Sequence, residues 1–90
     1  MKAKKEDHLI VGVHITDRVK HAPDVQKVLT EYGDHIKTRL GMNDRVLDHT
    51  GPAGLILLQM VGEEARADAM MRKLKKIRGV DAKKIIFKHR

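Results

Sequence analysis

The chain has 90 residues, of which 41% are hydrophobic and 34% are charged, with no cysteine and a formal net charge of +7. This size and composition predict one globular domain and argue against global disorder. The lack of cysteine excludes disulfides and thiolate metal sites. No segment approaches the ~20 apolar residues that span a bilayer, so we expect a cytoplasmic protein.

The basic excess lies in the last fifth of the chain. Residues 72–90 contain nine lysines and arginines and one aspartate, whereas residues 1–71 contain ten basic and eleven acidic residues. Such a segment suits nucleic acid, an acidic partner or an anionic ligand. The simpler interpretation, which we favour, is a solvated helix face followed by an edge strand guarded by lysines.

The first half of the chain predicts a strand, a helix and a second strand after a disordered tail over residues 1–7. Residues 8–15 alternate as a strand, in which Gly12 indicates close backbone approach. Pro23 suits the first turn of a helix that ends at Gly33. Its apolar stripe comprises Val25, Val28, Leu29 and Tyr32. Residues 34–42 then alternate as a half-buried strand, with Ile36, Thr38, Leu40 and Met42 on one face.

The second half repeats this rhythm after a turn segment over residues 43–54. Residues 55–61 form a strand with two apolar sets, one containing Leu55 and Leu57 and the other Ile56, Leu58 and Met60. A helix follows Gly62 and stops at Gly79. Its predicted buried stripe comprises Ala67, Met70, Met71, Leu74 and Ile77. Residues 80–89 form the fourth strand.

The order β-α-β-β-α-β over residues 8–90 predicts a single α+β domain with a ferredoxin-like fold. Its antiparallel four-stranded sheet has the first and third strands at the centre and both helices on one face. We expect the other face to expose Ile10, Ile56, Leu58 and Met60, with Ile86 or with Ile85 and Phe87. Monomers rarely expose so large an apolar patch, so we predict a homo-oligomer, either a dimer or a dimer of dimers, packed sheet on sheet or edge to edge.

The sequence resembles the family of iron-only hydrogenase system regulators over residues 8–88. The shared features are Asp17-Arg18 after an apolar strand, the pattern "EYGD-I--R-G" at residues 31–41, and "GLILLQMVG" followed by "KLKKIRGV". The resemblance implies an ACT-like fold, similar to the ligand-binding domain of the nickel-responsive repressor, in dimers or higher assemblies. It also implies regulation through a ligand or partner, without catalysis.

On this resemblance, the ligand contacts are Asp17 and Arg18, because ACT-type domains bind small molecules near the corresponding loop and the adjoining subunit. We add Arg39 as an anion partner, since a guanidinium can form two parallel hydrogen bonds with a carboxylate. The simpler alternatives are an ordinary turn at Asp17-Arg18 and an edge-guarding role for Arg39.

Six histidines raise the question of a metal, because zinc and nickel favour imidazole. The candidates are His14, His35 and His49. None lies in a tight ligand spacing, and the cysteine ligand of the nickel repressor has no counterpart. We therefore expect no metal and no other cofactor.

The sequence has no nucleophile elbow, Walker loop or paired-carboxylate signature, so we expect no enzymatic activity. RNA recognition on this strand order uses aromatic side chains on the sheet, and here Phe87 stands alone. The leading hypothesis is a non-enzymatic regulatory domain that oligomerises and binds a small effector or a protein partner. The alternatives are a basic module associated with nucleic acid and a metal-sensing variant of the regulator.

Overall fold

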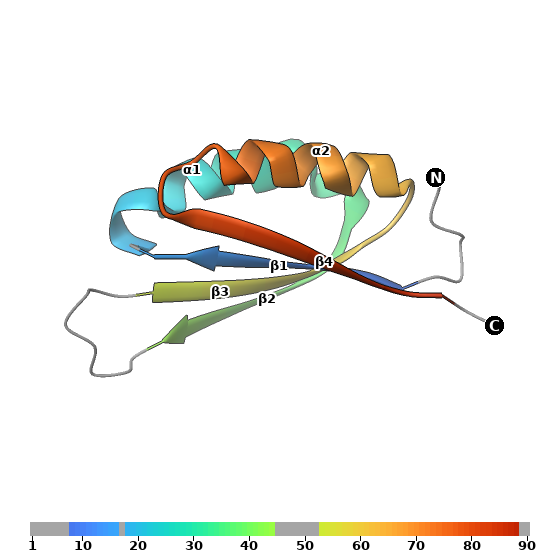
Figure 1. Ribbon diagram of the computed structural model, residues 1–90, viewed down its shortest axis with the longest axis horizontal. Coiled ribbons are helices and arrows are strands. Elements are labelled where there is room, and N and C mark those ends of the chain that lie inside the picture. The colour runs from blue at the N-terminus through green and yellow to red at the C-terminus, as the bar shows by residue number, and fades with distance from the viewer. Residues whose placement is uncertain (1–7, 17, 45–52, 89–90) are drawn as a thin grey trace.

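Both helices cover the same face of a four-stranded sheet in the computed structural model of the protein, which describes residues 8–16, 18–44 and 53–88 (Figure 1). The strand order is β2-β3-β1-β4 and every neighbouring pair is antiparallel. This arrangement confirms the predicted α+β ferredoxin-like fold, with the first and third strands at the centre. Neither helix of the described residues is long and apolar enough to cross a membrane.

The elements follow the predicted order, with shifted boundaries. They are β1 (His8–Ile15), α1 (Arg18–Glu31), a 3-10 turn η1 (Gly33–His35), β2 (Ile36–Asp44), β3 (Ala53–Met60), α2 (Glu64–Lys75) and β4 (Val80–Phe87). The prediction that Pro23 occupies the first turn of α1 is wrong, because the helix begins five residues earlier and Pro23 lies inside it. A proline there removes the backbone hydrogen bond that its amide would donate to the preceding turn.

The hydrophobic core lies between the sheet and the two helices. The β1 side chains Leu9, Val11, Val13 and Ile15 are all buried in it. Both predicted helix stripes also face this core, and Val28 and Ile77 are only partly buried at its margin. Each large apolar side chain that is fully buried contributes about 1.5–3 kcal/mol, so this layer supplies most of the stability.

Three of the four residues predicted for the oligomer interface lie instead in this core. Ile56, Leu58 and Met60 are 7%, 0% and 3% exposed. The register of β3 on β1 explains the error, because it pairs Met60 with Leu9 and Leu58 with Val11, and directly paired residues share a face. Alternation separated the two apolar sets of β3 correctly but could not tell which one faces the helices. Ile10 does lie on the uncovered side.

Strand β2 changes face at a bulge near its start. The pairing with β3 shifts register between Ile36 and Thr38, which leaves Lys37 as the extra residue. Ile36 therefore pairs with Met60 on the helix side and packs against the core, whereas Leu40 pairs with Leu57 on the other face and is 54% exposed. The prediction that Ile36 and Leu40 share one face is wrong for this reason.

The core assignment can be tested at Leu58. We expect Leu58→Ala to lower the free energy of unfolding by about 3 kcal/mol, because it removes buried methyl groups and leaves a cavity. Leu40→Ala makes the same chemical change on the exposed edge strand and should cost less than about 1 kcal/mol. Urea unfolding at low protein concentration measures both. Similar losses for the two variants would contradict the assignment.

Candidate ligand and subunit surface

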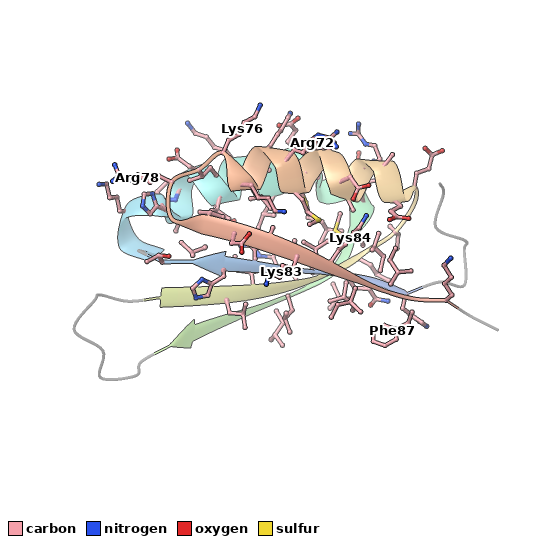
Figure 2. All side chains as sticks on the ribbon, in the orientation of Figure 1. Arg72, Lys76, Arg78, Lys83, Lys84 and Phe87 are labelled. Atoms are coloured by element: carbon pink, nitrogen blue, oxygen red, sulfur yellow. The ribbon has the colours of Figure 1, made fainter. Side chains whose placement is uncertain are left out.

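The uncovered face is the side of the sheet that points away from both helices. The strand registers place on it His8, Ile10, Gly12 and His14 of β1, Leu55, Leu57 and Gln59 of β3, Thr38 and Leu40 of β2, and Asp81, Lys83, Ile85 and Phe87 of β4. Four strands about 4.8 Å apart and about 26 Å long give this face roughly 500 Å² in projection. Phe87 projects from it on the side opposite the helices (Figure 2).

The apolar half of the uncovered face is the name we give to Ile10, Leu40, Leu57, Ile85 and Phe87, which lie diagonally across the sheet beside Thr38 and Gln59. Ile10 pairs directly with Ile85, which is 56% exposed, and Phe87 beside it is 58% exposed. On the same face, Leu57 of β3 pairs with Leu40 of β2. The apolar side chains thus extend across all four strands. The sequence predicted apolar side chains on this face from the first, third and fourth strands, although with a different set from β3.

The other half of the face contains a shallow hollow of about 390 Å³. It is lined by Gly12, His14, Leu55, Asp81, Ala82 and Lys83. Gly12 pairs with Lys83, and His14 pairs with Asp81 on one side and Leu55 on the other. Gly12 therefore forms the part of the floor that has no side chain, with charged and imidazole groups beside it. The Asp81 Oδ1 atom accepts a hydrogen bond from the Ala82 amide at 2.8 Å.

Of the three ligand contacts predicted from the sequence, only Arg39 has a described side chain, and Arg39 does not line the hollow. Asp17 lies outside the described residues, and Arg18 is described only as the first residue of α1. Arg39 is exposed on β2, but it pairs with Leu58 and so lies on the helix side of this edge strand. The end of β1 and Arg39 are about 13 Å apart along the sheet, in addition to the width of two strands. A shared site for these three residues stays a prediction.

The candidate metal ligands do not come together either. His14 pairs with Leu55 near the start of β3. The backbone carbonyl of His35 accepts a hydrogen bond from the amide of Val61, which lies just after the end of β3. Six residues of strand place them about 20 Å apart. His49 lies outside the described residues. Within the described ranges, no three histidine, aspartate or glutamate side chains form a cluster that could hold a metal ion.

The basic residues of the last segment divide between the two sides of the molecule. Arg72, Lys76 and Arg78 point away from the sheet on the helix side, whereas Lys83 lies on the uncovered face (Figure 2). Lys73 pairs with Glu31 and lies 5.4 Å from the centre of the Tyr32 ring. The described part of this segment therefore does not present all its cations on one surface.

Lys84 fastens the edge strand β4 to helix α2. Its Nζ atom donates to Asp68 at 2.6 Å and to Glu64 at 2.5 Å. These two hydrogen bonds raise the pKa of Lys84 above its ordinary value of 10.5. The alternation of β4 thus sends Lys84 to the helix side, where its charge is balanced, and Lys83 to the uncovered face.

Comparison with known proteins supports the fold and leaves the function open. No family model and no curated protein matches the chain. Among solved structures, the uncharacterized protein TM1266 from Thermotoga maritima is 25% identical, with a TM-score of 0.78 over 92% of this chain and 100% of that chain. A PII-like signaling protein from Thermus thermophilus is 14% identical, with a TM-score of 0.62 over 90% of this chain and 87% of that one.

A further similar structure is CPII from Thiomonas intermedia K12, which was solved with ADP, AMP and acetate bound. It is 11% identical, with a TM-score of 0.56 over 92% of this chain and 90% of that one. At such identities the PII-like proteins show a likeness of fold alone. The comparisons do not show that the chain belongs to the family of iron-only hydrogenase system regulators.

The contacts of Lys84 predict a stability difference that depends on pH. Because the pKa of Lys84 is raised on folding, its contribution is fully present below pH 10.5 and is lost as pH rises through the folded-state pKa. Wild type should therefore unfold at higher urea than Lys84→Met at pH 9, and the gap should close as pH rises from 10.5 through the raised folded-state pKa. Lys76→Met removes one exposed ammonium at the end of α2 and is the control. A gap for Lys84→Met that is constant with pH would contradict the assignment.

Proposed function

We propose that this chain is a non-enzymatic regulatory domain that works as a homo-oligomer and binds a small effector or a protein partner where its subunits meet. The observation that carries the proposal is the uncovered face, with Leu40, Ile85 and Phe87 each more than half exposed on it. Soluble monomers rarely leave a contiguous apolar patch of more than a few hundred Å² in water.

A second copy of the chain is the cover that fits this face best. Two sheets packed face to face interdigitate their side chains across a layer about 10 Å thick. About 500 Å² of projected face carries a larger accessible area, which approaches the ~800 Å² that each partner buries in a stable interface. A two-fold arrangement uses the same patch on both subunits, so the apolar half needs no second kind of surface.

The comparisons suggest which effectors to test first. CPII was solved with ADP, AMP and acetate, and another similar structure is a PII-like signaling protein. Small carboxylates and adenine nucleotides are therefore the two classes of effector to compare, and the charges that line the subunit surface can distinguish them. The resemblance to iron-only hydrogenase system regulators supports a role in transcriptional or metabolic regulation in the cytoplasm, with that system as its most specific form.

Nucleic acid is the second candidate partner, because Arg72, Lys76 and Arg78 share the helix side of the molecule. The ion pairs of Lys73 and Lys84 count against it, since they already balance two of the cations. Binding through phosphates weakens steeply with salt. A salt titration with duplex DNA and single-stranded RNA decides: no binding at low salt removes this candidate.

The oligomer can be tested at Ile85. Ile85→Lys should convert the wild-type oligomer to monomer, because it places an ammonium in an apolar contact. The monomer itself should remain folded, since this side chain is 56% exposed. Sedimentation velocity at micromolar concentration measures the assembly, and circular dichroism checks the fold.

Gln26→Lys is the matched control, because it adds the same charge at an exposed position of α1. It should leave the sedimentation coefficient unchanged. A wild-type protein that sediments as a monomer, or an Ile85→Lys variant that still assembles, would contradict the proposal.

A further inference from the structure

We propose that the hollow over Gly12 is one wall of a site for a small monocarboxylate with an apolar tail, closed by a second copy of the chain. This inference rests on the proposed function, because it places the effector where two uncovered faces meet. It goes further by naming the residues and the chemical class of the ligand.

Neither the backbone conformation nor the space around position 12 requires a glycine there. Its backbone is not in the left-handed region, which among the described residues only Gly62 and Gly79 adopt. A Cβ added at Gly12 would meet Leu57 Cδ2 at 3.7 Å, an ordinary contact. Glycine weakens a strand and often marks a place where another group approaches the backbone. Its effect here is to keep the floor of the hollow open.

The groups beside this floor suit a carboxylate. Lys83 lies directly across from Gly12, and His14 lies two residues further along β1. Both residues are exposed. Lys83 and His14 are diagonal neighbours on adjacent strands, positions that lie about 7–8 Å apart. From these positions an ammonium and an imidazole can each donate to one end of a carboxylate that lies over the glycine. Hydrogen bonds from a charged donor to a carboxylate are about twice as strong as neutral ones.

Asp81 limits the charge of the ligand. It pairs with His14 and lines the same hollow, and its Oδ1 atom accepts the Ala82 amide. This carboxylate would repel a dianion such as a phosphate monoester more strongly than a monoanion, so a ligand with a single negative charge is favoured beside Lys83. Leu55 lines the hollow and Leu57 flanks Gly12, so the rest of the ligand meets aliphatic side chains.

The second copy is needed because the hollow is open. Its volume of about 390 Å³ is sufficient for a small molecule. Ligand sites usually bury most of the ligand surface, and an open hollow on one face of a sheet covers the ligand from one direction alone. The apolar half of the uncovered face adjoins the hollow through Ile85, so a copy packed there lies over both. A ligand held between two subunits strengthens their association, and association strengthens ligand binding.

The test uses 3-methylbutanoate as the probe and its neutral amide, 3-methylbutanamide, as the matched ligand control. Titration of the wild-type protein should give saturable shifts of the Gly12 and Lys83 amide resonances in NMR spectra with the carboxylate. The amide should bind at least about tenfold more weakly, because it lacks the charge that Lys83 recognises. Sedimentation velocity should show more dimer with the carboxylate present.

Two substitutions localise the site. Lys83→Gln should weaken carboxylate binding about tenfold or more. Gly12→Leu should abolish it by filling the hollow, whereas Gly41→Leu places the same side chain in open space on the other face of the sheet and should bind as wild type. If Gly12→Leu does not fold, Gly12→Ala, whose Cβ makes only an ordinary contact, takes its place.

The outcomes separate this inference from the proposed function. A wild-type dimer with no saturable response to 3-methylbutanoate overturns the inference and leaves the regulatory oligomer standing. Equal binding of acid and amide, or full binding by Gly12→Leu, also overturns it. A protein that stays monomeric with and without the probe overturns the proposed function, and the closed site with it.

Discussion

The structure depends on one constraint: the sheet has two apolar faces, and the two helices cover only one of them. The pairing of β1 with β3 decides which face is covered, because it aligns Val11 with Leu58 and Ile10 with Gln59. The first pair lies in the core and the second on the uncovered face. The core and the candidate subunit surface therefore lie on opposite sides of the same strands, so a substitution on the uncovered face can be made without disrupting the core.

Strand β4 connects these two sides. Lys84 binds Asp68 and Glu64 of α2 and holds the strand to the helix layer. Its neighbours Lys83 and Ile85 point the other way, one to the hollow and one to the apolar half of the uncovered face. The same alternation therefore sends one cation of the basic segment, Lys84, to a structural ion pair and another, Lys83, to the candidate ligand site.

The sequence predicted the topology, both helix stripes and the two faces of β1, because each follows from local periodicity. It could not predict which set of β3 is buried, since Leu55 and Leu57 are as apolar as Ile56 and Leu58. That choice depends on long-range register. Gln59 was the available signal, because a glutamine suits a wet face better than a core position. The hollow had one signal in the sequence, the strand glycine at position 12. The bulge of β2 had none.

The edges of the sheet bear on how two copies could meet. The Thr16 amide bonds to Gly79, so the alternation of an antiparallel pair turns the Ala82 amide outward, where Asp81 accepts it. On the opposite edge, the bulge between Ile36 and Thr38 interrupts β2. Bulges and occupied edge groups are features that oppose strand addition. With both edges blunted in this way, packing through the uncovered face is favoured over pairing edge to edge, and the hollow over Gly12 then lies inside the contact.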